Sequence, residues 1–325
     1  MRILYGVMND MTWYEILIIA AAALLCIIVL LFIFCRRRKG DTAEPVTGGI
    51  LPATGTLENA LTGETQMENQ AMMRIGKLHE QGERSGQQDC FGISDESLIQ
   101  THGLLAIVAD GMGGLSDGDK VSVKAVETIL DGFAMYQGVC TPEQQLIFLA
   151  RQAVESVNEL LGPSELKKSG STLVMALVRD DRLSFLSVGD SRIYLYRNDV
   201  LLQLNREHIF RNKLALDAIN GDIALQEIYT DARKSSLISF LGMGRLEYID
   251  MPAEPVRLRP GDKLLLMSDG VYNALEEEEL SVCMKSDPGE AAERMKELIQ
   301  KKAYANQDNY TAVIMEMTCG EEAAD

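Results

Sequence analysis

The sequence predicts an α+β domain built from packed layers of sheet and helix, preceded by one transmembrane helix. Short apolar runs of strand length occur in groups, and segments with helical spacing of apolar residues separate these groups. Such grouping favours a layered α+β sandwich over alternating βαβ units. An uninterrupted apolar stretch near the N-terminus is long enough to cross a bilayer.

The apolar stretch covers residues 14–35 and contains a single charge, Glu15, at its edge. Four basic residues at 36–39 follow it, whereas only Arg2 precedes it. Because positive residues stay on the cytoplasmic side, residues 1–13 are expected outside and the rest of the chain in the cytoplasm. A cleaved signal peptide has its positive charge before the apolar core, so this order predicts an uncleaved anchor in the lipid bilayer. A buried soluble helix is the alternative interpretation.

After this anchor the sequence changes character twice. Residues 36–71 comprise the basic stop and a stretch rich in Thr, Gly, Glu and Pro without apolar periodicity, which predicts a flexible linker. Residues 72–318 have the pattern of a globular domain, and residues 319–325 form an acidic tail.

Within the globular part, apolar runs bounded by turn residues predict strands, and apolar residues at helical spacing predict helices. A strand is expected to precede each of the two turns in which an aspartate is followed by glycine, at Asp110 and Asp269. The expected strands are 72–79, 90–93, 104–109, 172–178, 183–188, 193–196, 201–204, 263–267 and 310–317, and the expected helices are 120–136, 142–161 and 288–303.

Composition excludes several classes of function. The chain has 325 residues, 46% of them hydrophobic, and a formal net charge of -17. This charge repels phosphate backbones, so no nucleic-acid partner is expected. Six cysteines occur without a CxxC pair, which argues against a disulfide framework or a thiolate zinc site.

Four aspartates occupy matching positions at strand ends: Asp89, Asp110, Asp269 and Asp308. Strand ends at one edge of a sheet gather in space, so these carboxylates are expected to converge. Converging carboxylates repel one another unless they share a proton or bind cations. Oxygen ligands without His or Cys favour magnesium, manganese or calcium. The alternative is that each aspartate only caps a helix or forms a turn, with Asp110 capping the helix that follows.

Six motifs in order make the domain resemble a metal-dependent Ser/Thr protein phosphatase of the PPM family (type 2C), in its bacterial form. The resemblance covers about residues 72–317. Its motifs are Arg84-Ser85-Gly86-Gln87-Gln88-Asp89, Asp110-Gly111-Met112-Gly113-Gly114, Ser169-Gly170-Ser171-Thr172, Gly189-Asp190-Ser191-Arg192, Ser268-Asp269-Gly270 and Asp308-Asn309.

The resemblance implies a four-layer α-β-β-α sandwich, with two packed antiparallel sheets flanked by helices. It also implies two divalent cations, Mn(II) or Mg(II), at one end of the sandwich. Asp110 would bridge them, the Gly111 carbonyl would bind one, and Asp269 and Asp308 would complete the other. Ligands or supports near them, partly through water, would be Asp89, Gln88, Asp190 and Asn309.

The implied activity is hydrolysis of phosphoserine and phosphothreonine on proteins by a water that the two metals activate. Arg84 would hold the phosphoryl oxygens as a bidentate donor. The partners would be phosphorylated proteins, including substrates of a Ser/Thr protein kinase. The alternative function is a pseudophosphatase that binds phosphoproteins with little turnover, and a purely structural membrane adaptor is a third interpretation.

Several positions depart from the family pattern or carry other roles. Met112 replaces a histidine found in some members, and Gln88 replaces the commoner glutamate. Lys167 and Asn273 stand where the family often has aspartates that hold a third metal, so a weak or absent third site is expected. Segment 207–240 would form a flap beside the site. Supporting roles are expected for Ser171, Thr172, Arg192 and His208.

Overall fold

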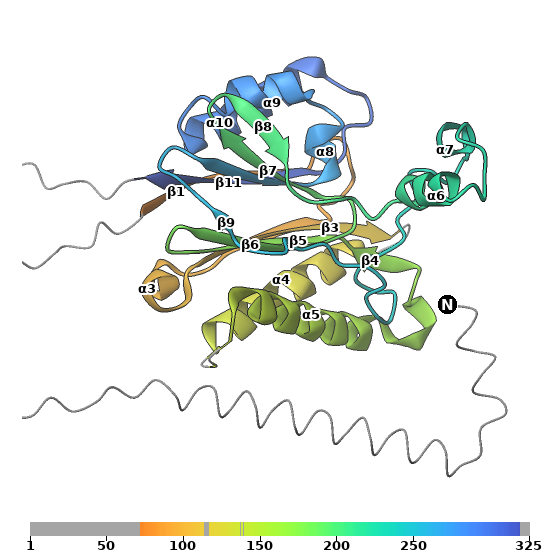
Figure 1. Cartoon of the computed structure of the whole chain (residues 1–325), viewed down its shortest axis with the longest axis horizontal. Coiled ribbons are helices and arrows are strands. Elements are labelled where there is room, and N and C mark those ends of the chain that lie inside the picture. Colours follow the sequence, from red (N-terminus) through yellow and green to blue (C-terminus); the bar gives the residue numbers. More distant parts are fainter. Residues whose placement is uncertain (1–71, 114–116, 137, 139, 319–325) are drawn as a thin grey trace, which may run out of the picture. The chain divides into compact units, whose positions relative to one another are not determined.

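Two antiparallel sheets packed face to face form the centre of the domain (Figure 1). The computed structural model describes residues 72–113, 117–136, 138 and 140–318. The predicted anchor at 14–35, the linker and the acidic tail lie outside these residues. In the part that is described, no helix has the length and apolar character needed to cross a membrane.

The first sheet has the strand order β1-β11-β10-β7-β8, and each neighbouring pair is antiparallel. The second has the order β2-β3-β5-β6-β9, with β4 pairing to the end of β3. The strands are β1 (Met72–Glu80), β2 (Asp89–Ile93), β3 (Leu104–Gly113), β4 (Ser169–Ser171), β5 (Leu173–Arg179), β6 (Arg182–Val188), β7 (Arg192–Arg197), β8 (Val200–Gln203), β9 (Val256–Arg257), β10 (Lys263–Met267) and β11 (Tyr310–Thr318).

Helices cover the outer face of each sheet and complete the four layers (Figure 1). On the second sheet lie α4 (Gly118–Ala134) and α5 (Pro142–Glu165), and on the first α9 (Glu277–Cys283) and α10 (Pro288–Lys302). The short helices are η1 (Glu96–Leu98), α3 (Ile99–His102), α6 (Phe210–Ile219), α7 (Glu227–Thr230) and α8 (Asp269–Tyr272). The predicted α+β sandwich is thus confirmed.

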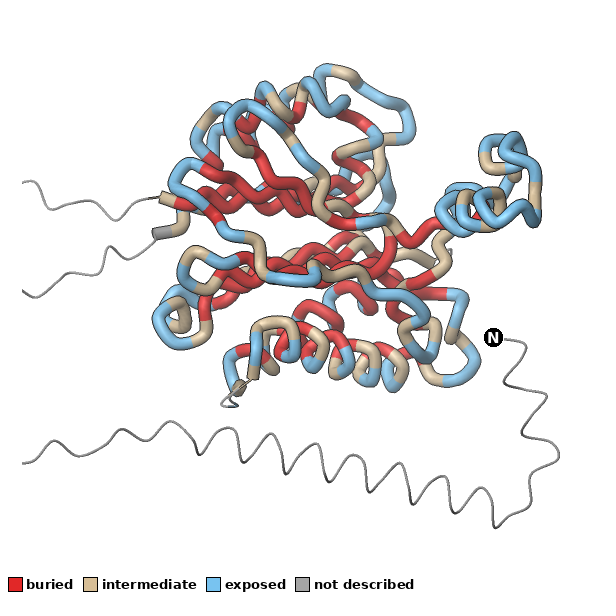
Figure 2. Tube along the Cα trace, in the orientation of Figure 1, coloured by how far each residue is buried: buried red, intermediate tan, exposed pale blue. Residues whose placement is uncertain are grey.

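The apolar run of β3 is buried on both faces, as its uninterrupted hydrophobicity predicts. Leu105 and Ile107 pack in the layer beneath α4 and α5, whereas Leu104, Ala106 and Val108 pack between the two sheets. Side chains alternate along a strand, so Asp110 continues the face that lies between the sheets. Figure 2 shows this buried centre. The alternation therefore places a carboxylate at the end of the inter-sheet layer.

Two expectations about element boundaries need correction. Asp110 does not end its strand, because β3 continues to Gly113 by pairing with β4. The helix α9 was also missed, because its stretch of consecutive glutamates has only Leu280 and Cys283 buried. The other expected strands and helices agree with the structure to within a few residues at each end.

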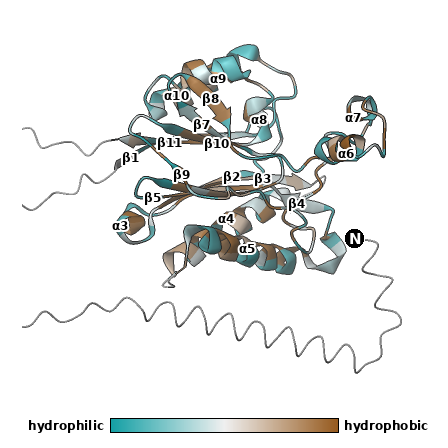
Figure 3. Cartoon of the chain, viewed as in Figure 1, coloured by the Kyte–Doolittle hydropathy of each residue, from teal (hydrophilic) through white to brown (hydrophobic). Residues whose placement is uncertain are grey.

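The predicted flap, residues 207–240, contains α6 and α7 and projects from the end of the sandwich where β3 meets β4 (Figure 1). Figure 3 shows apolar residues on this otherwise exposed segment. The side chains of Leu216, Ile219, Leu225 and Tyr229 are each more than half exposed. Only Leu214 is buried in α6, so the flap contributes little to the core.

Candidate active site

A cavity of about 330 Å³ lies at the end of the inter-sheet layer, beside the flap. Elements of both sheets contribute to it, because Asp110 comes from β3 while Asp269 and Asp308 adjoin β10 and β11. The residues that line it are Arg84, Gln88, Asp110, Gly111, Met112, Gly113, Thr172, Asp190, Leu237, Asp269, Asp308 and Asn309. Nearly all the site residues predicted from sequence therefore meet in one place.

The backbone of Asp110 is fixed on both sides by the Ser171–Thr172 pair. The Asp110 N–H donates to Thr172 Oγ1 (3.0 Å), and the Asp110 carbonyl accepts from Thr172 N (2.9 Å) and Ser171 Oγ (3.0 Å). Thr172 Oγ1 also shares a 2.7 Å hydrogen bond with Ser191 Oγ. The expected supporting role of Ser171 and Thr172 is confirmed, and it leaves the Asp110 carboxylate to face the cavity.

Asp89 lies behind the cavity rather than in its lining. It sits opposite Asp110 in the β2–β3 pair and is only 4% exposed. Its carboxylate accepts a hydrogen bond of 2.7 Å from Ser268 Oγ, next to Asp269. Asp89 thus joins the β3 side of the site to the turn after β10.

Asp269 and Asp308 approach from the first sheet, and each has a polar neighbour. Asn273 Nδ2 donates to Asp269 Oδ2 at 3.2 Å. Arg84 forms an ion pair of 2.6 Å with Asp308 Oδ2, and the Arg84 side chain is 56% exposed. The guanidinium therefore stands at the rim of the cavity, where it can reach both Asp308 and an incoming anion.

Asn309 holds the loop that carries Arg84. Its side-chain amide donates to the carbonyls of Gln81 (2.6 Å) and Gly86 (2.9 Å), and its Oδ1 accepts from Gln88 N (2.8 Å). Asn309 is 4% exposed, so these three bonds satisfy a buried amide. Its supporting role at the site stays a prediction.

Two glycines allow the backbone to approach closely at the site. A Cβ atom on Gly111 would lie 2.2 Å from the Gly118 carbonyl oxygen and 2.4 Å from that of Gln88. A Cβ atom on Gly270 would lie 1.9 Å from the Asn309 carbonyl oxygen. Both neighbours are backbone, so the glycine of each Asp-Gly pair is required by packing.

The carboxylates of the site have raised pKa values because they are buried close to one another. Burial, and then the neighbouring carboxylates Asp89 and Asp269, raise the pKa of Asp110 well above its usual value. Burial raises the pKa of Asp89 to about 6. Burial and then the charge of Asp269 raise the pKa of Asp190 to about 7. A cluster that resists ionisation in this way is suited to a positive partner.

The donor set fits hard divalent cations, because it consists of carboxylate and carbonyl oxygens. Over the described residues, no group of three or more His, Cys, Asp and Glu side chains already forms a closed ligand set. Asp308 is instead paired with Arg84. The carboxylates face one cavity, and some of them would have to approach one another around a cation.

Other predicted residues lie nearby with structural roles. Arg192 pairs with Glu207 (2.6 Å) and stacks 3.6 Å above the Tyr272 ring. His208 Nδ1 accepts from Gly189 N at 3.1 Å, and its ring is 8% exposed, so packing and turn support are confirmed. Lys167 does not line the cavity.

The sequence interpretation missed the role of Ser268. Its hydroxyl donates to Asp89 and also accepts from the Thr311 N–H at 3.0 Å, so it links the ends of both sheets. The signal was present, since Ser268 precedes Asp269 in a recognised motif. Its burial behind the cavity is a tertiary feature that no local pattern indicates.

The site combines buried carboxylates, which can bind cations, with a guanidinium at the rim, which can bind a phosphoryl group. Proteins with this combination can act on phosphorylated molecules with the help of metal ions. The family profile described as Protein phosphatase 2C matches residues 75–304. A serine/threonine phosphatase, stp, from Listeria innocua is 31% identical over 227 residues, covering 68% of this chain and 87% of the relative. The chain therefore belongs to the protein phosphatase 2C family.

Solved structures agree with this membership. The PPM Ser-Thr phosphatase MsPP from Mycobacterium smegmatis, crystallised with cacodylate, has a TM-score of 0.59 at 28% identity. The match covers 76% of this chain and 98% of that one. The catalytic domain of PstP, in complex with two manganese ions, shares the fold with a TM-score of 0.58 at 23% identity, covering 76% of this chain and 99% of that one.

The neutral Asn273 beside Asp269 leads to a prediction about cation number. We expect Asn273→Asp to add one carboxylate oxygen and to raise the manganese stoichiometry by one ion per chain. Isothermal titration of the full-length chain with Mn(II) measures this number. Lys167→Asp, alone and combined with Asn273→Asp, is the companion variant. Binding of three ions by the wild-type chain would show that its third site is already complete.

Proposed function

We propose that this chain is a protein serine/threonine phosphatase that hydrolyses phosphoserine and phosphothreonine on proteins with the help of two divalent cations, Mn(II) or Mg(II). The observation that supports this most is the convergence of Asp110, Asp269 and Asp308 on one cavity with Arg84 at its rim. The names of the relatives point the same way.

In this proposal Asp110, the Gly111 carbonyl, Asp269 and Asp308 would hold the two cations. When bound, the cations would lower the pKa of a water molecule and neutralise the charge of the phosphate. Asp89 and Gln88 would support these ligands directly or through water, and Asp190 would add a further carboxylate to the lining of the cavity. These assignments rest on the cavity lining and on the family.

The contacts of Arg84 support its proposed role in binding phosphate. It is paired with Asp308, a proposed cation ligand, and it is more than half exposed. A cation at Asp308 would weaken this pair by supplying a competing positive charge. The freed guanidinium would then bind two phosphoryl oxygens in the bidentate geometry that arginine favours. Arg84 thereby places a positive charge at the rim of the cavity, in a chain whose net charge of -17 would repel a phosphorylated substrate.

The alternative of a binding protein without turnover receives no support from the site. Three of the proposed cation ligands are carboxylates that line the cavity, and three hydrogen bonds hold the backbone of Asp110. This organisation favours hydrolysis over binding alone.

We also propose that residues 14–35 anchor the phosphatase in a bilayer, with the domain in the cytoplasm. The support is the sequence: one charge in the apolar stretch, and four basic residues directly after it. Alkaline carbonate extraction of membranes that contain the full-length chain tests this. Retention in the pellet is expected, and release into the supernatant would contradict the anchor.

The test of the proposed activity is phosphate release from a phosphothreonine peptide by the full-length chain. We expect hydrolysis with Mn(II) or Mg(II) and none after treatment with a chelator, because the cations supply the activated water. Unchanged hydrolysis in excess chelator would contradict the mechanism. Absence of hydrolysis with every cation would favour the binding alternative.

The pH and the bound cations should both affect the thermal stability of the folded protein. Asp89 and Asp190 have pKa values raised to about 6 and about 7 when no cation is bound, against about 4 in an unfolded chain. The folded state therefore holds protons more tightly, so its stability falls as pH rises from about 4 to 7. We therefore expect the Tm of the chelated protein to fall as the pH rises over this range.

Excess Mn(II) should reduce the dependence of Tm on pH, because bound cations stabilise the ionised carboxylates. Thermal unfolding at a series of pH values, with and without Mn(II), measures both curves. A chelated protein whose Tm rises steadily from pH 4 to 7 would contradict the repulsion on which the assignment depends.

A further inference from the structure

A second hollow of about 680 Å³ adjoins the active-site cavity across the flap. The two are separated by neighbouring residues of one segment, since Leu237 lines the cavity and Ile238 lines the hollow, here called the flap groove. The flap groove is lined by Gln203, Asn205, Arg206, Glu207, His208, Asn212, Lys213, Leu216, Ile238, Tyr248, Ile249 and Asp250.

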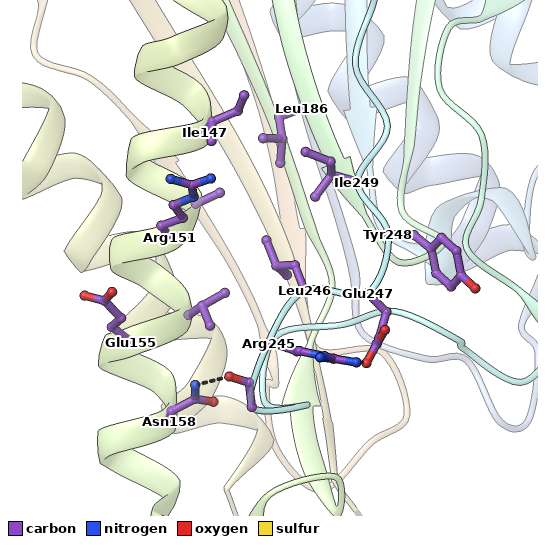
Figure 4. A pocket seen from close by; sticks show the side chains of 13 residues that line it. Ile147, Arg151, Glu155, Asn158, Leu186, Arg245, Leu246, Glu247, Tyr248 and Ile249 are labelled. Carbon is purple, nitrogen blue, oxygen red and sulfur yellow. Dashed lines mark hydrogen bonds and ion pairs between the residues drawn. The ribbon is translucent and has the colours of Figure 1, made fainter. Parts of the chain in front are cut away.

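The walls of the flap groove expose apolar surface. Leu216 on α6 is 62% exposed, and Tyr248 and Ile249 on the opposite wall are 51% and 41% exposed. Figure 4 shows a different crevice, between α5 and residues 244–249, and the Tyr248 ring points away from it. The ring lies beside His208 instead, with centroids 6.2 Å apart. Tyr248 and Ile249 line both this crevice and the flap groove.

The charges of the flap groove are not balanced among themselves. Glu207 is already paired with Arg192 and Arg211 from outside the lining. Asp250 Oδ2 accepts from the backbone N–H of Arg206 at 2.8 Å. Asp250 keeps its negative charge, so Arg206 and Lys213 leave an excess of one positive charge in the groove, in a chain of net charge -17.

From this combination we propose that the flap groove binds the polypeptide of the phosphorylated substrate, and that it selects an aliphatic and an acidic side chain near the phosphorylated residue. The inference rests on the proposed phosphatase function. An extended peptide advances about 3.3 Å per residue. Leu237 and Ile238 are consecutive residues that line the cavity and the groove, so we place the selected side chains a few residues from the phosphorylated residue. Leu216 and Ile249 contact the aliphatic side chain, and Lys213 and Arg206 attract the acidic one.

The experiment compares three substrates of the full-length chain with Mn(II). They are a phosphothreonine peptide with Leu and Asp placed two to four residues away on either side, its all-alanine counterpart, and para-nitrophenyl phosphate. We expect kcat/KM to favour the Leu/Asp peptide by roughly tenfold, the lower end of what one apolar contact discriminates. Leu216→Asp and Lys213→Glu should remove this preference and leave hydrolysis of the aryl phosphate unchanged.

Matched control variants distinguish an effect of the groove from a general effect of adding a negative charge to the surface. Ile219→Asp changes a residue of the same helix that is 77% exposed and outside the groove. Lys124→Glu makes the same charge change on the exposed face of α4. Both should retain the preference. Equal hydrolysis of the two peptides by the wild type, or equal loss in Ile219→Asp, would overturn the proposal while the phosphatase function stands.

Two further outcomes would also overturn the proposal. If Leu216→Asp abolishes a dimer of the wild-type chain seen by light scattering and leaves the peptide preference intact, the groove is an interface between copies. If none of the three substrates is hydrolysed with any divalent cation, the proposed function fails and this inference fails with it.

Discussion

Asp110→Asn should reduce kcat/KM for a phosphothreonine peptide by about a thousandfold. The proposed cations share this carboxylate, and metal stabilisation of a transition state contributes several kcal/mol. Since each 1.36 kcal/mol is about tenfold in rate, a loss near 4 kcal/mol gives this figure. Steady-state kinetics over a range of Mn(II) concentrations measures it.

The same variant should not unfold the protein. Asp110 has its pKa raised by burial and by Asp89 and Asp269, so removing its charge relieves repulsion. We expect the Tm of the chelated variant to equal or exceed that of the wild type. Asp131→Asn, on the exposed side of α4, is the control and should leave both activity and Tm unchanged. Full activity of Asp110→Asn would remove Asp110 from the mechanism.

Gly270→Ala should damage both stability and activity although it adds one methyl group. Its Cβ would lie 1.9 Å from the Asn309 carbonyl oxygen, so backbone must move. Overpacking typically costs about 1–3 kcal/mol. Asp269 precedes Gly270 and Asp308 precedes Asn309, so the same shift separates the two carboxylates. A displacement near 1 Å can cost about a hundredfold in rate, and we expect kcat/KM to fall by that order.

Gly289→Ala is the matched control for this variant. A Cβ there lies 3.5 Å from Asp287 Oδ1, which is ordinary contact, and alanine favours the first turn of α10. We expect unchanged activity and an equal or slightly higher Tm. Wild-type Tm and kcat/KM in Gly270→Ala would show that the turn after β10 yields without moving either aspartate.

The convergence of the aspartates was predictable from the sequence because local rules determine it. An apolar run buried on both faces predicts β3, and the alternation of side chains carries Asp110 into the layer between the sheets. Asp269-Gly270 follows β10 as expected, whereas Asp110-Gly111 lies within β3. Residues 269 and 308 then meet Asp110 because β10 and β11 are neighbours in the facing sheet.

Other features depend on tertiary contacts that no local pattern contains. Asp89 and Asp110 are both expected at the ends of apolar runs, yet Asp89 is buried behind the cavity against Ser268. The Arg84–Asp308 pair joins residues that are 224 positions apart. The flap groove is formed by α6 and by Tyr248 and Ile249, which lie outside any strand or helix.

The most direct test of the central claim is anomalous diffraction at the manganese edge from crystals of this protein grown with Mn(II). We predict two manganese peaks in the cavity, both within coordination distance of the Asp110 carboxylate, with Asp269 and Asp308 on one of them and Arg84 released from Asp308. A cavity without manganese in crystals of protein that is active with Mn(II) would contradict the assignment of this site.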